Sequence, residues 1–375
     1  MNQNRRLFLG QASISLAALA LGACAGNSPR PEKLGPDAVV DAAHAGKPGD
    51  FIDGHPTYQT IQQALDAAPL FAHTWEILIR RGRYHEKPTV VGNGVRLIGE
   101  DRAETIITYD AWAGQARPGG AGSWRTPGSA TLTVSGADFR AENLTIENAF
   151  DWIGNDKMDR SGPDYLRDPQ AVALYISGRA DKSVLRNITI AGYQDTLFHD
   201  AGRACFDHCS ISGNVDFIFG SGQGWFDTCD IITRPVGRVT AKVGYITAAS
   251  TFAGKKYGLV IHACRLARES SAVPANSTAL GRPWHPSGDP QAVGAAVYLD
   301  CWMDDHIEAD GWESMSSTTK SGQKVIFTPE ESRFFEYRSY GPGTTLNAKR
   351  RQLTEAQASE YTRDRVLDGW IPRVS

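Results

Sequence analysis

The chain has 375 residues, of which 41% are hydrophobic and 22% are charged, an ordinary balance for a globular protein. Its formal net charge of −3 argues against an extended basic surface for nucleic acid, and an anionic ligand would have to be held by local basic residues. The length fits either two domains or one long all-β architecture.

The first predicted element is an export signal. Arg5 and Arg6 form a twin arginine, and an apolar stretch follows and ends in the small residues before Cys24. A positive start, a short apolar region and small residues at the end predict a signal peptide over residues 1–23. The apolar stretch is short for a transmembrane helix and is interrupted by polar residues, which disfavours a membrane span.

The sequence LGAC at 21–24 resembles a bacterial lipobox, and the twin arginine resembles a Tat export signal. We therefore expect Cys24 to become the lipidated first residue of the mature protein. Ala25, rather than an aspartate, follows the cysteine, and this arrangement resembles lipoproteins that are sorted to the outer membrane. We expect residues 24–36 to be a flexible tether and residues 37–375 to be the folded domain.

The segment TIQQALDAAP predicts a short helix. Thr60 and Gln63 form a capping-box pattern, and Pro69 ends the segment. Apolar residues recur at helical spacing at Ile61, Ala64, Leu65 and Ala68.

Short β-rich segments then repeat, as NLTIEN (143–148), NITIAG (187–192), HCSISG (208–213) and TCDIIT (228–233). Their equivalent positions, spaced by 44, 21 and 20 residues, are Leu144, Ile188, Cys209 and Cys229. A fixed period with one short strand per face indicates a solenoid, and the spacing of leucine-rich repeats is absent. The prediction is an all-β fold: a single-stranded right-handed parallel β-helix, with the Thr60 helix capping one end.

Export makes disulfides possible, so the cysteines matter. In the predicted solenoid Cys209 and Cys229 occupy equivalent inward positions on adjacent coils. Neighbouring strands lie about 4.8 Å apart, near the Cα separation that a disulfide tolerates. We expect a Cys209–Cys229 disulfide; the alternative is a stack of reduced, buried thiols. The pairing of Cys205, Cys264 and Cys301 stays open.

Three Gly- and Pro-rich stretches, at 113–128, 154–169 and 268–295, predict long loops that project from the coils. Binding clefts are usually built from such loops. Near the C-terminus, Thr354 and Gln357 form a second capping box and predict a C-terminal helical segment.

The repeat also aligns polar residues. Asp195 and Asp216 are 21 residues apart, which is one coil, and Gln170 precedes Gln194 by 24 residues. We expect these four side chains on one face of three successive coils, with the carboxylates about 5 Å apart. Two carboxylates that close do not both ionise easily, so one pKa rises. A protonated acid beside a carboxylate can serve as a general acid beside a nucleophile, and the amides can donate to a developing oxyanion. A single such residue could merely satisfy a turn, but four at matched positions predict a functional site.

Four motifs resemble those of the pectin methylesterases, a family of carbohydrate esterases. They are GYQDTLF (192–198), GNVDFIFG (213–220), LGRPW (280–284) and QAVALY (170–175). The resemblance covers nearly the whole mature chain and is closest to the bacterial branch. It implies a right-handed parallel β-helix that hydrolyses the methyl esters of galacturonate in pectin or in methylated oligogalacturonides, without a metal or another cofactor.

Carried over by position, the resemblance implies that Asp216 is the nucleophile and that Asp195 is the acid and base. Gln170 and Gln194 would stabilise the oxyanion, and Arg282 would orient Asp216. The residues implied to line the substrate groove are Thr131, Tyr175, Phe198, Val215, Phe219, Ala248, Arg282, Trp284 and Met303. Phe198 stands where the family has a tyrosine, so one hydroxyl beside the site is missing.

Other functions on the same polymer or with other catalytic groups fit the sequence less well. A pectate lyase would need a calcium-binding acidic cluster, and an inverting glycosidase needs carboxyl groups roughly 6.5–9.5 Å apart. Neither G-x-S-x-G nor H-E-x-x-H occurs in the chain. Two alternatives stay open: an esterase or thioesterase for a non-pectin ester, and a non-catalytic carbohydrate-binding lipoprotein of the outer membrane. We expect a monomer that binds no nucleic acid.

Overall fold

The computed structural model describes residues 35–69, 74–120 and 122–372. The predicted signal peptide, Cys24 and most of the predicted tether lie outside the described residues. Residues 36–375 form one unit by their contacts. None of the helices in the described ranges is long and apolar enough to cross a membrane.

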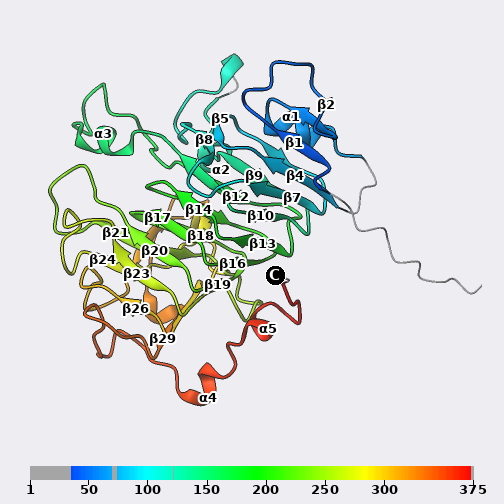
Figure 1. Cartoon of the computed structure of the whole chain (residues 1–375). Helices are drawn as coiled ribbons and strands as arrows, with labels where there is room; N and C mark the ends of the chain where they lie inside the picture. Colours follow the sequence, from blue (N-terminus) through cyan, green and yellow to red (C-terminus); the bar gives the residue numbers. More distant parts are fainter. Residues whose placement is uncertain (1–34, 70–73, 121, 373–375) are drawn as a thin grey trace, which may run out of the picture. The chain divides into compact units, whose positions relative to one another are not determined.

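In the middle of the solenoid each coil contributes one strand to each of three long sheets, which we call A, B and C (Figure 1). Coils at the ends contribute strands to only some of the sheets. Within the described residues the sheets contain twelve, eight and seven strands. Pairing between successive coils is parallel in all three. Antiparallel pairing joins β2 to β3 at the start of sheet A, and it joins β27 (Met315–Thr318) to β28 (Lys324–Phe327) in a separate two-stranded sheet. The prediction of an all-β parallel β-helix is therefore confirmed.

The strands of sheet A, in spatial order, are β2 (Asp50–Ile52), β3 (His55–Tyr58), β1 (Ala38–Val40), β4 (Trp75–Ile79), β7 (Val95–Gly99), β10 (Arg140–Glu142), β13 (Ser183–Arg186), β16 (Arg203–Asp207), β19 (Gln223–Asp227), β22 (Leu259–His262), β25 (Ala295–Leu299) and β29 (Arg333–Tyr337). Sheet B consists of β26 (Trp302–Met303), β23 (Arg265–Arg268), β20 (Asp230–Thr233), β17 (Ser210–Gly213), β14 (Thr189–Ala191), β11 (Thr145–Asn148), β8 (Thr105–Tyr109) and β5 (Gly82–His85). Sheet C consists of β24 (Thr278–Gly281), β21 (Gly244–Ala249), β18 (Val215–Gly220), β15 (Leu197–His199), β12 (Leu174–Ile176), β9 (Leu132–Val134) and β6 (Thr89–Val90).

The repeat predicted from the sequence matches the strand pairing observed in sheet B. Ile146 pairs with Ile190, Ile190 with Ile211, and Ile211 with Ile231, so one isoleucine per coil stacks on the next. All four side chains are fully buried in the core that runs through the solenoid. Burying a side chain of this size contributes about 1.5–3 kcal/mol, so the repeated column stabilises the stacking of the coils.

Short helices occupy the ends and the loops of the solenoid. The helices are α1 (Ile61–Asp66), α2 (Arg125–Gly128), α3 (Trp152–Lys157), α4 (Glu355–Ala358) and α5 (Arg363–Val366), with 3₁₀ turns at Pro118–Gly120, Pro286–Gly288 and Pro329–Glu331. The predicted capping box is present at the start of α1, where Thr60 accepts from the Gln63 backbone. Ile61 and Ala64 bury the apolar face of α1 in the core, so the helix covers the N-terminal end of the solenoid.

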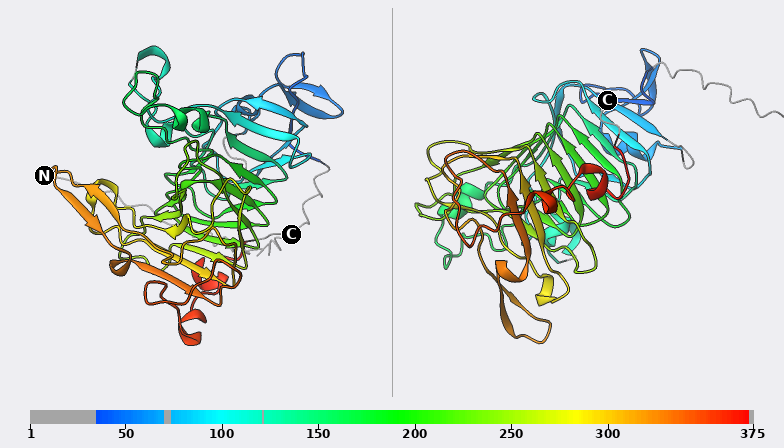
Figure 2. Two further views of the ribbon diagram at one scale, coloured as in Figure 1. Left: turned by 90° about the vertical axis from the view of Figure 1, so that its left-hand side faces the viewer. Right: turned by 90° about the horizontal axis from the view of Figure 1, so that it is seen from below.

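The predicted C-terminal helical segment is also present, with the expected capping box at Thr354. It runs back along the outer face of sheet A and places α5 beside β19 (Figures 1 and 2). Val366 and Leu367 pack there against Trp225 and Val260 in a second apolar cluster. The segment therefore shields sheet A from solvent, which is a different role from closing the end of the solenoid.

The predicted Cys209–Cys229 disulfide is not formed, because both residues are free, buried thiols. The Cys209 Sγ donates to the Leu185 carbonyl at 3.3 Å, and the Cys229 Sγ donates to the Phe206 carbonyl at 3.4 Å. Side chains at equivalent positions of parallel strands point the same way and keep the strand separation of about 4.8 Å. A disulfide needs Cβ atoms about 3.5–4.5 Å apart, so the stacked geometry favours reduced thiols.

We expect all the cysteines of the folded domain to titrate as thiols. The free, buried cysteines are Cys205, Cys209, Cys229, Cys264 and Cys301. Burial raises the pKa of the Cys205 and Cys301 thiols to about 12, which makes both unreactive in the native state. A chain starting at residue 36 should react with a thiol reagent only after unfolding in guanidinium, without reductant. If the unfolded chain reacts with two fewer thiol equivalents than its number of cysteines, the predicted disulfide does form.

Candidate active site

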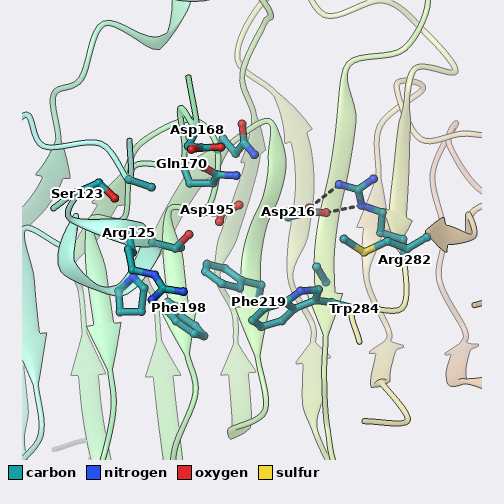
Figure 3. A pocket seen from close by; sticks show the side chains of 16 residues that line it. Ser123, Arg125, Asp168, Gln170, Asp195, Phe198, Asp216, Phe219, Arg282 and Trp284 are labelled. Carbon is teal, nitrogen blue, oxygen red and sulfur yellow. Dashed lines mark hydrogen bonds and ion pairs between the residues drawn. The ribbon is translucent and has the colours of Figure 1, made fainter. Parts of the chain in front are cut away.

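The predicted catalytic residues line one pocket of about 580 Å³ on sheet C (Figure 3). The sheet-C strands β12, β15 and β18 belong to successive coils, and the polar residues stand at or before the start of each of these strands. Predicted site residues found in the lining are Gln170, Gln194, Asp195, Phe198, Asp216, Phe219, Ala248, Arg282 and Trp284. The period in the sequence therefore did bring distant polar residues together.

Asp216 stands at a β-bulge, and this explains how a carboxylate fits beside buried strand residues. Its φ is 51°, and the register between β18 and β21 shifts between Val215 and Ile218. A bulge re-aims one side chain out of the regular alternation. Phe217 and Ile218 stay fully buried, whereas the Asp216 side chain reaches the pocket.

Arg282 provides the charge that compensates Asp216. Its Nε donates to Oδ1 at 2.8 Å and its Nη2 donates to Oδ2 at 2.6 Å, a bidentate ion pair (Figure 3). The carboxylate side chain is only 10% exposed and the guanidinium side chain 20%, so water screens the pair weakly. The guanidinium also stacks on the Tyr245 ring at 3.8 Å, and the Tyr245 hydroxyl donates to Glu313. Asp216 therefore holds the arginine in its plane, and Tyr245 holds it on one face.

Asp195 is the second carboxylate and its environment is different. It is buried, and its backbone N–H donates to the Val215 carbonyl on the next coil at 3.0 Å. Desolvation raises the pKa of Asp195 well above its usual range, and the neighbouring Asp216 charge raises it further against an opposing effect of Arg282. The two carboxyl groups therefore differ: Asp216 is ion-paired, and Asp195 retains its proton to a higher pH.

The two glutamines lie on the coils next to the carboxylates. The Ala171 N–H donates to the Gln194 carbonyl at 3.1 Å, which aligns the backbones beside Gln170 and Gln194. The Gln194 Oε1 accepts a hydrogen bond from the Trp152 indole at 3.4 Å. Each amide carries N–H donors, the groups that can stabilise a developing oxyanion in such a pocket.

Aromatic rings form the apolar part of the lining. Phe198 stacks on Phe219 with ring centroids 4.2 Å apart, and Trp284 meets the Phe219 ring edge-on at 5.4 Å. Phe198 is only 5% exposed, so a tyrosine hydroxyl at this position would have to emerge at the edge of the stack. Flat apolar faces beside polar groups suit the faces of sugar rings.

Four residues predicted for the groove are not in this lining. Met303 is fully buried in the core, where its Sδ accepts from Arg350, and the methionine that does line the pocket is Met315. Thr131 is also fully buried, and its hydroxyl donates to the Glu147 carbonyl. Tyr175 stacks beneath Phe198 at 4.6 Å. Val215 lines a neighbouring pocket.

The sequence reasoning missed the residues that loops bring to the pocket: Ala113, Ser123, Arg125, Thr126, Pro127, Asp168 and Met315. All but Met315 come from the stretches 113–128 and 154–169. These stretches were expected to build a cleft, and their composition was the only available signal. Loop residues have no period, so their composition could not show which side chains face the pocket.

We expect Arg282→Lys to lower kcat by roughly 10²-fold with a smaller change in KM. A lysine keeps the charge but cannot donate to both oxygens of Asp216 in one plane, so the carboxylate loses its orientation. Arg203→Lys is the matched control, because Arg203 makes the same bidentate pair with Asp181 outside the pocket. A kcat near that of the wild type would show that orientation by Arg282 is unimportant.

Within the described ranges no group of three or more His, Cys, Asp or Glu side chains could hold a metal ion.

Comparison with known proteins identifies the family. A pectinesterase family model matches residues 51–369. The chain is 44% identical to Pectinesterase A of Dickeya dadantii over 326 residues, which are 84% of this chain and 88% of that protein. It is 32% identical to the pectinesterase of Petunia integrifolia over 306 residues, 80% of this chain and 71% of that protein.

Solved structures agree with the sequence comparison. Pectin methylesterase PemA from Erwinia chrysanthemi matches with a TM-score of 0.85 and 42% identity, over 92% of this chain and 100% of that one. The pectin methylesterase from Yersinia enterocolitica matches with a TM-score of 0.80 and 42% identity, over 84% and 99%. With the family model covering most of the folded domain, the chain belongs to the pectinesterase family of carboxylic ester hydrolases.

Proposed function

We propose that this protein hydrolyses methyl esters of galacturonate in pectin, or in methylated oligogalacturonides, and releases methanol and a free carboxylate. One observation carries the proposal: an ion-paired carboxylate, Asp216, and a buried carboxyl group with a raised pKa, Asp195, line the same pocket. Family membership supports it, and a similar pectin methylesterase of known structure, 42% identical to this chain, is a complex with a hexasaccharide.

In the first half-reaction, an oxygen of Asp216 attacks the ester carbonyl. The carbonyl π electrons move to its oxygen, and the amides of Gln170 and Gln194 stabilise this oxyanion. The intermediate collapses, the bond to the methoxy oxygen breaks, and Asp195 donates its proton to that oxygen, which leaves as methanol. The product is an anhydride between Asp216 and the galacturonate carboxyl group, and Asp195 is left as a carboxylate.

In the second half-reaction, Asp195 acts as a base. It takes a proton from a water molecule, whose oxygen attacks the anhydride carbonyl of the sugar. The tetrahedral intermediate is again stabilised by the glutamine amides, and its collapse releases the Asp216 carboxylate. Arg282 remains paired with Asp216 and receives it back as an anion. Asp195 regains its proton, so the site returns to its starting state.

The test is methanol release from highly methylated pectin and from short methylated oligogalacturonides. We expect methanol from both, unchanged by EDTA, with no unsaturated products and no new reducing ends. Hydrolysis of simple non-sugar esters or thioesters, without methanol from pectin, would favour the alternative of a different ester substrate. Binding to the oligosaccharide without any product would favour the non-catalytic alternative.

We also propose that the protein is exported and anchored by lipid on Cys24 in the outer membrane. The lipobox-like LGAC at 21–24 and the following Ala25 support this location. Cells are labelled with a palmitate analogue and fractionated, with Cys24→Ser as the comparison. Label and membrane association in the wild type, both lost in the variant, are expected. An unlabelled, soluble wild-type protein would make residues 1–23 an ordinary cleaved signal.

The oligomeric state is proposed to be monomeric. The five predicted catalytic side chains of one chain line the same pocket, which is compatible with a monomer. Light scattering of the folded domain at several concentrations measures this directly.

A further inference from the structure

The basic residues around the active site differ in whether an acidic side chain forms an ion pair with them. A second pocket of about 330 Å³ adjoins the first, and Gln194 lines both. The basic side chains that line the two pockets are Arg125, Arg160, Arg238, Lys242 and Arg282. Pairing decides which of these charges can attract an external anion.

Four of the five have acidic partners. Arg160 and Arg238 both pair with Asp156, at 3.4 and 3.1 Å. Lys242 pairs with Glu308 at 2.5 Å and also with Glu313, while Arg282 is held by Asp216. Among the described residues that line these pockets, Arg125 is therefore the one basic side chain without an acidic partner.

The backbone of Arg125 is also unusual. Its φ is 57°, a conformation that glycine adopts freely and that a long side chain adopts only at a cost. Its N–H donates to the Ala113 carbonyl at 2.7 Å, and its carbonyl accepts from the Ser129 N–H at 3.1 Å, so the loop fixes this conformation. The result is an exposed guanidinium at the pocket that no intramolecular hydrogen bond of the described residues occupies. A strained residue that carries an unpaired charge into a cleft is a candidate binding group.

We propose that Arg125 binds the free carboxylate of a galacturonate that lies further along the same substrate chain, so that the enzyme prefers esters flanked by de-esterified sugars. This inference rests on the proposed function. A planar guanidinium donates two parallel hydrogen bonds to a carboxylate, whereas a methyl ester offers neither the charge nor the second acceptor oxygen. Arg125 thus discriminates between the acid and the ester at the sugar that it contacts.

Arg125 and Asp216 lie apart along the pocket. Arg125 leads into β9, which is three strands from β18 in sheet C. At about 4.8 Å per strand, β9 lies roughly 14 Å from β18, the strand that carries Asp216. Figure 3 shows the same arrangement, with Arg125 at one end of the pocket and the Asp216–Arg282 pair at the other. The acid product of one turnover then becomes a favourable neighbour for the next.

Asp168 is the other charged group of this part of the lining, and the described structure forms no ion pair between Arg125 and Asp168. A carboxylate repels an acidic sugar, so the sugar nearest Asp168 is expected to be tolerated best as the neutral ester. The two charges therefore favour different sugars: the free acid beside Arg125 and the methyl ester beside Asp168.

The experiment compares initial rates on two methylated hexagalacturonides of equal length. One is fully esterified and the other carries a single methyl ester on an inner sugar. For the wild type we expect kcat/KM to favour the singly esterified substrate by about tenfold at low salt, and less at high salt because the contact is exposed. In Arg125→Gln the preference should vanish, because KM should rise about tenfold on the singly esterified substrate and much less on the fully esterified one.

Two further variants separate charge from loop structure. Arg117→Gln removes a neighbouring arginine that stacks on Trp124 and is not part of the pocket lining, so the preference should persist. Arg125→Gly should relieve the backbone, raise Tm and still abolish the preference. Equal losses on both substrates in Arg125→Gln, or an unchanged preference in Arg125→Gly, would overturn the inference. A wild type that releases no methanol from either substrate would instead refute the proposed function.

Discussion

Replacing Asp216 with asparagine is expected to lower the rate of methanol release by roughly 10³-fold or more. An amide cannot attack the ester carbonyl, so the acyl intermediate cannot form. The remaining groups of the pocket could still bind and polarise the ester, which accounts for a small residual rate. Methanol measured from a methylated oligogalacturonide, under saturating and limiting substrate, reports the loss in kcat and in kcat/KM.

The same substitution leaves Arg282 without a charged partner in a pocket where it is only 20% exposed. We expect a lower Tm, because a partly buried guanidinium that loses its carboxylate is costly. Asp181→Asn breaks a second bidentate pair, with Arg203 of β16, which lies outside the pocket lining. This control should lower stability without affecting turnover. Substantial turnover in a folded Asp216→Asn protein would exclude Asp216 as the nucleophile.

Replacing Asp195 with asparagine is expected to reduce methanol release by at least about 10²-fold, the typical contribution of a general acid. Asparagine has nearly the same shape but cannot give a proton to methanol or take one from water. In the wild type, kcat/KM should fall as pH rises through the raised pKa of Asp195, since the acid is then lost. The residual rate of Asp195→Asn should lack this alkaline limb. A variant that retains both the rate and the limb would contradict the assignment.

Stability gives an independent measure of Asp195. Its folded pKa is raised from the usual value of 3.8, so between that value and the raised pKa the folded chain holds a proton that the unfolded chain has released. Stability therefore falls as pH rises through this window, and the loss stays in place above it. Asparagine has no such penalty, so the Tm of Asp195→Asn should exceed that of the wild type by a margin that grows with pH. If the Tm difference between Asp195→Asn and the wild type does not change with pH, Asp195 is not desolvated.

Several features of the fold could be predicted from the sequence because a solenoid repeats its own constraints. Each coil must place an apolar side chain at the same inward position, and this requirement spaced Ile146, Ile190 and Ile211 so that their strands pair in register. The helix caps were equally local, since Thr60 and Thr354 contact residues only three positions away. The same period is enough to predict Asp195 and Asp216 on adjacent coils.

Other features depend on directions and loops, which the tertiary structure alone decides. The thiols of Cys209 and Cys229 lie on adjacent coils as expected, yet parallel strands aim them in the same direction and keep them apart. Met303 was assigned to the groove by position, but its strand belongs to sheet B, whose side chains at that point enter the core.

The sequence by itself determined the architecture and the pair of carboxylates, because both follow from a period that local side-chain patterns reveal. Only the tertiary structure decided how the pair differs: Arg282 reaches Asp216 across 66 positions, and Asp195 is left desolvated beside it. It also brought Arg125 to the pocket, from a loop without a period. Charge pairing and desolvation depend on distances between side chains in space. The sequence predicts such distances only within the repeat, where a fixed spacing places residues on adjacent coils.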